Sequence, residues 1–446
     1  MSTWAESHGK VYFPSSGLPP WIKRFVTVAC VIVGLFSVVF AARNPSAPNS
    51  GTWIGTWGSA PQAALPGKVQ TYHNQTLRLI VHISAGGNTL RVRISNTFGD
   101  QPLFIGAAHI ARRNSAAEID PTSDRPLKFH GHASVRIRAG SMVMSEPVAV
   151  DLQPLSDLAV SLFLPEATAA KSLHILAQQT SYLSTDNGDS TAAVKFPVAK
   201  QIHTWPFLSG VDVKTPTGAT IVAFGSSTTD GDGSSSDANR RWPDVLAEEL
   251  LKDTKIKTTF GVLNEGIIGN RLLEDSPRQT SFGSALGQAG LLRFQRDVLD
   301  QAGVRYVFMA LGVNDIIFPG SFTPATQKVD SASIIAGYRQ LVARAHQKGI
   351  KVIGTTIPPF ENATFNDPEI ANIYTPEKES VRQEVNKWIL SGGAFDAVVD
   401  FDAVLRDPAR PTRLLPAFDS GDHLHMNDAG YVVCGKKIPL SLFEMH

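Results

Sequence analysis

The chain has 446 residues, of which 43% are hydrophobic and 18% are charged. A chain of this length and composition can bury large cores, so we exclude a disordered protein and expect two or three domains. The formal net charge is +1 and the sequence contains no basic run, which argues against nucleic acid or an anionic surface as the main partner.

An apolar segment near the N-terminus predicts export. Residues 25–42 are uncharged and mostly apolar, follow Lys23 and Arg24, and end in small residues. The segment is long for the apolar part of a cleaved signal and short for a spanning helix, so a secretory signal and a single-span membrane anchor both stay open. Either one, with its linker within residues 1–50, places the rest of the chain outside the cytoplasm by the positive-inside rule.

The two cysteines cannot form a disulfide within an exported domain. Cys30 and Cys434 are the only two in the chain, and Cys30 lies inside the apolar segment. We therefore expect the exported part to depend on its hydrophobic cores for stability.

Short alternating runs predict an antiparallel β-sandwich domain over residues 52–212. Apolar residues alternate with others in 77–83 and again in 90–94, and a glycine-rich turn at 86–88 separates the two runs. Two runs of period two around such a turn are typical of a β-hairpin. Similar runs recur between turn residues, at 135–138, 148–152 and 158–164. Many short strands of this kind favour a sandwich.

Alternating strand-like and helix-like segments predict a doubly wound α/β domain over residues 216–446, with a five-stranded parallel sheet. The expected strands are 221–224, 258–263, 305–311, 351–356 and 397–400. Residues 331–348 place apolar side chains on one face at helical spacing and are followed by Gly349, which is typical of a helix end. Ligands of such folds bind at the carboxyl ends of the strands.

Candidate catalytic residues follow the carboxyl ends of these strands. Ser227 comes after the first strand, in a turn that leads into a helix containing 242–251, Gly269 follows the second strand, and Asn314 follows the third. Asp422 and His425 lie in the loop beyond the fifth strand, three residues apart. Because these carboxyl ends meet at one edge of the sheet, we expect the five residues to form one site.

Hydrolysis of an ester requires a nucleophile, a base and donors that face the developing oxyanion. We expect Ser227 to attack the carbonyl, His425 to accept and return the proton, and Asp422 to orient the imidazole. The oxyanion would be held by the backbone N–H groups of Ser227 and Gly269 and by the side-chain amide of Asn314. Such a site requires neither a metal ion nor an organic cofactor.

The dispersed blocks resemble those of the SGNH hydrolases, also called GDSL-type esterases and lipases, which supply Ser, Gly, Asn and His from four blocks. The matching residues are Ser227, Gly269, Asn314, Asp422 and His425. The resemblance covers roughly residues 219 to 437 and implies a flavodoxin-like α/β fold and a carboxylic ester hydrolase. The preceding region, which opens with Trp-Ile-Gly-Thr-Trp-Gly at 53–58, is similar to the N-terminal domain of a multidomain subgroup of these esterases.

Two positions depart from the family pattern. Ser226 stands where the family has Asp before the nucleophile, and Met426 stands where the last block has Pro after the histidine. Ser and Asp both cap helix N-termini, so we expect Ser226 to act as a cap without loss of catalysis. We expect the departures to alter the entrance and the substrate range instead.

Several residues have alternative interpretations. Ser227, Gly269 and Asn314 could each serve only a turn, and Gly266 is also placed to approach a ligand. His423 lies one residue from Asp422 and would point away on an extended segment.

A metal-binding loop is a further alternative for the acidic residues after the nucleophile. Their spacing fits no Ca²⁺ loop, and Gly/Ser/Asp-rich connections are usually solvated. The residues concerned are Asp230, Asp232 and Asp237.

We expect an exported serine esterase that removes short acyl groups, such as acetyl, from a small-molecule or polysaccharide ester. A lipase or lysophospholipase is an alternative, in which the apolar segments 316–319 and 357–360 would line an acyl pocket. A second alternative is a non-catalytic glycan-binding protein that retains a relic hydrolase domain. The sequence leaves the oligomeric state open.

Overall fold

The computed structural model describes residues 51–185, 188–365 and 370–444. The apolar segment 25–42 lies outside these residues, so its role in export stays a prediction. Among the helices of the described ranges, none has both the length and the apolar character that a bilayer crossing requires.

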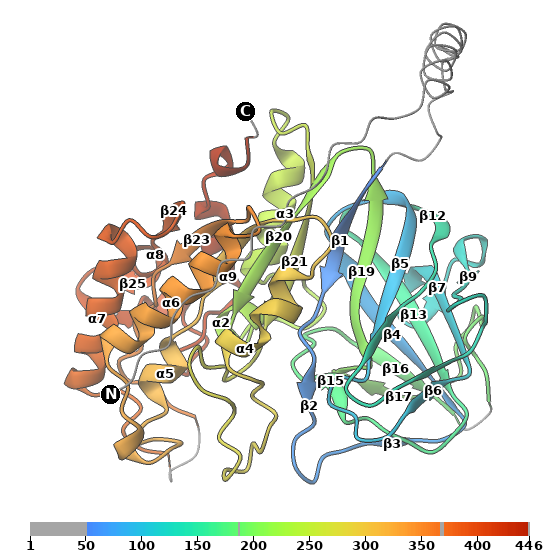
Figure 1. Cartoon of the computed structure of the whole chain (residues 1–446), viewed down its shortest axis with the longest axis horizontal. Helices are drawn as coiled ribbons and strands as arrows, with labels where there is room; N and C mark the ends of the chain where they lie inside the picture. The colour runs from blue at the N-terminus through green and yellow to red at the C-terminus, as the bar shows by residue number, and fades with distance from the viewer. Residues whose placement is uncertain (1–50, 186–187, 366–369, 445–446) are drawn as a thin grey trace, which may run out of the picture. The chain divides into compact units, whose positions relative to one another are not determined.

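Five parallel strands form the sheet of the C-terminal half (Figure 1). They are β20 (Gly218–Gly225), β21 (Thr259–Gly266), β22 (Val304–Ala310), β23 (Lys351–Thr355) and β24 (Ala397–Val399). Their order across the sheet is β21-β20-β22-β23-β24, with every neighbouring pair parallel. This order confirms the predicted α/β class, and each predicted strand agrees with an observed one to within a few residues.

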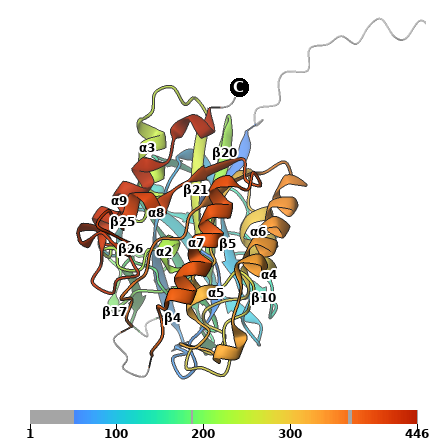
Figure 2. The ribbon, with the colours of Figure 1, turned by 90° about the vertical axis from the view of Figure 1, so that its left-hand side faces the viewer.

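Helices cover both faces of the parallel sheet (Figure 2). One layer comprises α4 (Gly290–Phe294), α5 (Val313–Ile317), α6 (Ser331–His346) and α7 (Pro376–Ser391). The other comprises α3 (Trp242–Lys252), α8 (Phe401–Leu405) and α9 (Asp428–Lys437). Side chains of a strand alternate between faces, so Val222 and Phe224 of β20 pack in the first layer while Ile221 and Ala223 pack in the second. The sheet is therefore doubly wound, as predicted.

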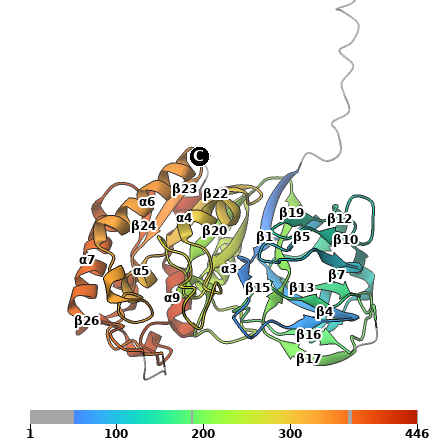
Figure 3. The same cartoon turned by 60° about the horizontal axis from the view of Figure 1, so that its bottom comes forward.

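Two antiparallel sheets form the N-terminal half (Figure 3). The first contains β1 (Thr52–Gly58), β5 (Gly87–Ser95), β11 (Met142–Met144), β12 (Val148–Leu152) and β19 (Leu208–Thr215). The second contains β4 (Gln75–Ile83), β7 (Ala107–Ser115), β8 (Glu118–Ile119), β9 (Arg125–Pro126), β13 (Ser156–Leu164), β16 (Ser181–Ser184) and β17 (Val198–Ile202). Apolar side chains of both sheets share one core, as expected for the predicted sandwich.

One sheet of three short strands and three short strand pairs are also present. They are β2 (Gln62–Ala63) and β18 (Trp205–Pro206) on either side of β15 (Ser172–His174), β3 (Thr71–Tyr72) with β14 (Thr168–Ala169), β6 (Leu103–Ile105) with β10 (Val135–Ile137), and β25 (Arg406–Asp407) with β26 (Arg410–Leu414).

The hairpin predicted around residues 86–88 is wrong. The two runs form β4 and β5, but β4 pairs with β13 and β16, whereas β5 pairs with β19, β11 and β12. The connecting residues bond to β1 instead of folding back: Ser84 N–H donates to the Thr56 carbonyl at 2.9 Å and Thr56 Oγ1 donates to the Ala85 carbonyl at 2.7 Å. The chain thus crosses from one sheet to the other at this turn.

The two halves belong to one compact unit, Gly51–His446, and strand β1 lies along the edge strand β21. The Gly55 N–H donates to Thr220 Oγ1 at 2.9 Å, and the Val262 N–H donates to Ser84 Oγ at 2.8 Å. Gly261 approaches the Gly55 carbonyl so closely that a Cβ there would lie 1.8 Å from its oxygen. The antiparallel half therefore supports both β21 and β20, the strand that leads to Ser227.

Candidate active site

Ser227 is the first residue of α2 (Ser227–Asp230), a single turn of helix that follows β20. The residue is buried, with 4% of its surface exposed. Ser226 occupies the N-cap position, but its hydroxyl makes no cap hydrogen bond and has no partner among the described residues. The predicted side-chain cap is therefore wrong, because the N–H groups of Thr229 and Asp230 both donate to the Ser226 carbonyl at 2.9 Å.

The path after Ser227 also differs from the prediction. Gly231 ends α2 in a left-handed conformation with φ of 107°. A loop over residues 232–241 then precedes α3, so two helices follow the nucleophile where one was expected. The loop brings Asp232 to the site.

Ser227, His425 and Asp422 form a continuous chain of hydrogen bonds. His425 Nε2 lies 2.8 Å from Ser227 Oγ, and His425 Nδ1 lies 2.6 Å from Asp422 Oδ2. A carboxylate can only accept, so Nδ1 carries a proton, and in the neutral imidazole Nε2 is then free to accept from the serine hydroxyl. The geometry is that of a nucleophile, a base and an orienting carboxylate.

The loop before α9 holds Asp422 in place. Its Oδ1 accepts from the backbone N–H groups of Leu424 at 2.9 Å and His425 at 2.8 Å, and from Ser420 Oγ at 3.1 Å. Burial alone would raise the pKa of Asp422, but the hydrogen bonds from His425 and from the backbone lower it to about 2. Asp422 therefore stays ionised at neutral pH.

Asp232 is a second carboxylate beside His425 that the sequence did not identify as part of the site. Its Oδ2 lies 3.7 Å from His425 Nε2. Burial lowers the pKa of His425, but the hydrogen bond to Asp422 and the negative charge of Asp232 outweigh it, so the pKa lies above the ordinary value of about 6.5. Burial, together with the charges of Asp230 and Asp422, raises the pKa of Asp232.

The predicted oxyanion donors lie in two turns that bond to each other. Gly269 has φ of 69°, a conformation that favours glycine, and Asn314 lies in the first turn of α5. Asn314 Nδ2 donates to the Asn270 carbonyl at 2.9 Å, which leaves its second proton for a ligand. Within the described chain, no protein acceptor binds the N–H of Ser227 or of Gly269.

Residues 221–438 match the model of a family described as GDSL-like Lipase/Acylhydrolase. These residues form a GDSL-like lipase/acylhydrolase domain. The match confirms the family that the four sequence blocks predicted, and members of this family hydrolyse esters.

Several solved structures resemble this chain over about half its length. The aryl esterase of M. smegmatis is 20% identical, with 51% of this chain and 97% of that chain covered and a TM-score of 0.37. A GDSL-like lipase from Bacteroides thetaiotaomicron is 18% identical, with 50% and 87% covered and a TM-score of 0.35. A carbohydrate acetylesterase from Sinorhizobium meliloti is 15% identical, with 49% and 94% covered and a TM-score of 0.35. No curated protein matches the sequence.

Arg293 of α4 supports the candidate site of the GDSL-like domain through hydrogen bonds to its backbone. No sequence motif predicted this role. Its guanidinium is buried and pairs with Asp297 at 3.0 Å. It donates to the carbonyls of Gly225 and Glu265 at 2.8 and 2.9 Å, and to Asn270 Oδ1 at 2.9 Å. One side chain therefore holds the ends of β20 and β21 and the turn of Gly269.

His174 of β15 links the antiparallel half to the GDSL-like domain. Its Nε2 lies 2.8 Å from Asp230 Oδ1, and its Nδ1 lies 2.9 Å from the Ala60 carbonyl. Both partners are acceptors, so an ionised Asp230 requires protons on both ring nitrogens of His174 and makes it a buried imidazolium. Asp230 Oδ2 also accepts the Ile268 N–H at 3.0 Å, next to Gly269. No sequence pattern joins positions 174 and 230, so only the structure could identify the pair.

The structure assigns separate partners to the remaining acidic and histidine candidates. His423 pairs with Asp419, away from Ser227. Asp237 accepts from the N–H and the hydroxyl of Thr180, both at 2.6 Å. The loop carboxylates Asp230, Asp232 and Asp237 thus have three different environments.

The two apolar segments do not form an exposed surface at the site. Ile316, Ile317 and Phe318 of the first segment and Ile357 and Phe360 of the second are at most 3% exposed. All five pack in the core beneath α6 and α7. Ile316 and Pro319 also line a cavity of about 220 Å³, and Ile357 and Pro358 line a small cavity with Thr228 and Thr229. The acyl pocket predicted from these segments therefore stays a prediction.

Proposed function

We propose that the protein is an exported serine esterase that cleaves carboxylic esters through an acyl-enzyme. The observation that carries the proposal is the hydrogen-bond chain from Ser227 Oγ through His425 to Asp422, with distances of 2.8 and 2.6 Å. Membership of the GDSL-like family supports ester hydrolysis in general. The serine mechanism and the substrate are the parts that we infer.

In the proposed reaction, Ser227 Oγ attacks the ester carbonyl while His425 Nε2 takes its proton. His425 then gives this proton to the departing alkoxide, which leaves as an alcohol. Water attacks the acyl-enzyme in the second half, and His425 again takes a proton and returns it to Ser227. Gly269, Asn314 and the Ser227 N–H donate to the carbonyl oxygen as it becomes negative.

A cavity with both polar and apolar lining supports an acylated carbohydrate as the substrate. The cavity is about 810 Å³ and is lined by charged, amide, hydroxyl and apolar side chains from within residues 271–280 and 322–333. Its size suits a small organic ligand. Residues of the two apolar segments line two smaller cavities, so a lipase stays the alternative.

Export is inferred from the sequence of residues 25–42, with an uncharged apolar run after Lys23 and Arg24. We propose that the folded part acts outside the cytoplasm, secreted, periplasmic or held by an anchor. Protease accessibility in cells whose cytoplasmic membrane is intact but whose outer membrane, if present, has been opened tests this location: digestion only after the cytoplasmic membrane is lysed would contradict it.

The enzymatic proposal is tested with Ser227→Ala and 4-nitrophenyl acetate. We expect the substitution to lower kcat/KM by at least about a thousandfold, because it removes the nucleophile, and to leave the circular dichroism spectrum unchanged. The parent protein should also react with a fluorophosphonate probe at Ser227. Full hydrolysis by the variant would refute the mechanism, and failure of the parent to be labelled would favour a non-catalytic glycan-binding protein.

The acyl group is tested with 4-nitrophenyl esters from acetate to palmitate. The proposal predicts the highest kcat/KM for acetate and a steady fall with chain length. A maximum at octanoate or longer would support the lipase alternative.

A further inference from the structure

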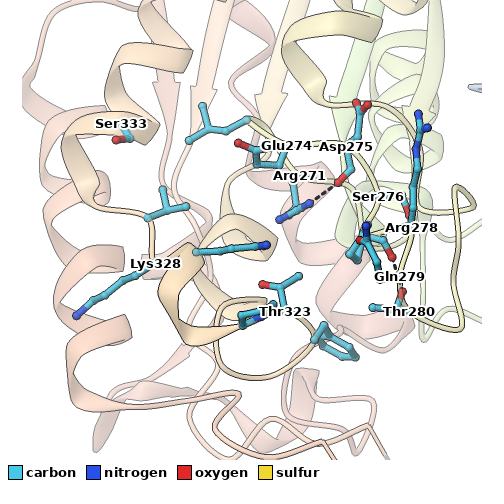
Figure 4. A pocket seen from close by; sticks show the side chains of 16 residues that line it. Arg271, Glu274, Asp275, Ser276, Arg278, Gln279, Thr280, Thr323, Lys328 and Ser333 are labelled. Carbon is cyan, nitrogen blue, oxygen red and sulfur yellow. Dashed lines mark hydrogen bonds between the residues drawn. The ribbon is translucent and has the colours of Figure 1, made fainter.

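A cavity of about 810 Å³, drawn in Figure 4, is lined by residues that follow the oxyanion turn and α5 in the sequence. One of its walls, residues 271–280, directly follows Gly269 and Asn270 at the oxyanion turn. The opposite wall, residues 322–333, follows α5 and Asn314. A ligand in the cavity would therefore contact the loops that position the ester.

Arg271 lines this cavity, and Figure 4 shows its guanidinium between the loop of Asp275 and Thr323. The residue is only 7% exposed. Its Nη2 donates to the Asp275 carbonyl, and its Nε has no partner in the described chain. The guanidinium forms no salt bridge with any described residue and otherwise faces the ring of Phe318 at 5.5 Å.

The guanidinium groups of the other buried arginines of the described residues bind carboxylates or several neutral acceptors. Arg241 binds both oxygens of Asp244, Arg293 pairs with Asp297, and Arg382 pairs with Glu379 and Asp402. Arg78 has no carboxylate partner but donates to Ser161 and to four backbone carbonyls. A buried charge without such partners is costly. Arg271 is thus the exception, because its Nε–H has no hydrogen-bond acceptor among the described residues.

The backbone around Arg271 is held to the third sequence block on both sides. Asn270 accepts from Asn314, and the N–H groups of Leu272 and Leu273 donate to Asp315 at 2.7 and 2.9 Å. Arg271 is two residues from Gly269, so their Cα atoms are at most about 7.6 Å apart. The backbone of Arg271 is therefore adjacent to the oxyanion turn, and a substrate that extends from this turn into the cavity contacts the lining to which Arg271 belongs.

The charges of the cavity suit a single negative charge. The cations that line it are Arg271, Arg278 and Lys328, and the carboxylates are Glu274 and Asp275. The lining residues alone therefore carry one net positive charge. The carboxylate of Asp315, which is not in the lining, also acts on Arg271, so the balance of charge suits a singly charged carboxylate better than a doubly charged phosphate.

We propose that Arg271 binds a carboxylate of the substrate, so that the enzyme acts preferentially on esters whose acyl or alcohol part is acidic, such as an acetylated uronic acid. The planar fork of a guanidinium matches the two oxygens of a carboxylate. This inference rests on the proposed esterase function, because it assigns the substrate of the same site.

Binding of small carboxylates to the inactive Ser227→Ala protein tests the proposal by calorimetry. D-Glucuronate and benzoate are compared with their neutral partners D-glucose and benzamide. We expect at least one carboxylate to bind about tenfold or more tightly than its partner. Adding Arg271→Gln should abolish this preference, whereas Arg271→Lys should keep part of it because the charge remains.

Arg339→Gln is the matched control, because Arg339 is an exposed arginine of α6 outside the cavity lining. It should leave the carboxylate preference intact. Thermal melting followed by circular dichroism establishes that each variant is folded, and Arg271→Lys decides the question if the Gln variant is not.

The proposal is overturned if neither carboxylate binds more tightly than its neutral partner, if the preference survives Arg271→Gln, or if Arg339→Gln removes it equally. Inorganic phosphate that binds while both carboxylates fail would also overturn it. The same carboxylate should inhibit hydrolysis of 4-nitrophenyl acetate competitively, and non-competitive inhibition would contradict a place in the substrate site. Failure of the parent protein to hydrolyse 4-nitrophenyl acetate would refute the esterase function while leaving the binding result readable.

Discussion

Replacing His174 by Gln should destabilise the fold more than any surface substitution. The His174 and Asp230 side chains are 2% and 3% exposed and lie 2.8 Å apart, in the contact between the two halves of the molecule. Removing one partner of a buried ion pair leaves the other charge uncompensated, which costs about 3–5 kcal/mol. Asp230 would retain the Ile268 N–H, so we expect a loss of about 3 kcal/mol in the free energy of unfolding.

Urea unfolding followed by tryptophan fluorescence measures this loss. Trp205 is a suitable reporter, because its ring centroid lies 5.7 Å from that of His174. Asp230→Asn and the double variant complete a double-mutant cycle. We expect the double variant to lose less stability than the sum of the two single variants, because it leaves no unpaired charge. A loss below about 1 kcal/mol for His174→Gln, or strict additivity in the cycle, would refute the buried ion pair.

The same pair predicts a dependence of stability on pH. Burial lowers the pKa of His174, but Asp230 and the Ala60 carbonyl outweigh it and raise the pKa above its ordinary value. A raised pKa in the folded state means that the stabilisation is complete below about pH 6.5 and is lost as pH rises through the folded-state pKa. The parent protein should therefore lose stability on the alkaline side, and His174→Gln should lose less over the same range, because only the contribution of His425 remains. An identical alkaline slope in both proteins would contradict the assignment.

Three further substitutions test the electrostatics of the site. Asp232→Asn removes a charge that raises the pKa of His425, so the rise of kcat/KM with pH should move to lower pH, and an unchanged profile would contradict this role. Asp422→Asn should lower kcat by about a thousandfold or more, because the imidazole loses its orienting acceptor, and a loss under tenfold would exclude that function. Glu265 is buried, Oε1 has no partner in the described chain, and burial raises its pKa. Because the pKa is raised in the folded state, the free energy of unfolding falls as pH rises above about 4.5, where the unfolded chain already ionises Glu265. Glu265→Gln should therefore raise Tm at pH 8 more than at pH 4.5, and equal shifts would refute this.

Local sequence patterns determined the architecture of the GDSL-like domain and the positions of its candidate residues. Each buried strand is a short apolar run, and Ser227, Gly269 and Asn314 each follow a run directly. The carboxyl ends of parallel strands in a doubly wound sheet lie at one edge, so a residue that directly follows an apolar run is expected at that edge. Ser227, Gly269 and Asn314 could therefore be assigned to one site from the sequence.

The antiparallel half shows where local patterns are insufficient. Alternation in 77–83 and 90–94 indicated two strands, and both exist as β4 and β5. The hairpin between them was wrong, because period two determines which side chains share a face and not which strand lies alongside. The pairing was decided by hydrogen bonds of residues 84 and 85 to β1, a strand almost thirty residues away.

The sequence by itself predicted a doubly wound domain with candidate Ser, His and Asp residues at one edge of its sheet, because the strands depend on neighbours along the chain and the strand ends give the places of these residues. Only the tertiary structure decided the partners of the buried charges. His174 meets Asp230 across the two halves, Asp232 approaches His425, and Arg271 faces a cavity with donors unused. The free energy of a buried charge depends strongly on the group that lies next to it, and the fold can bring that group from any part of the chain.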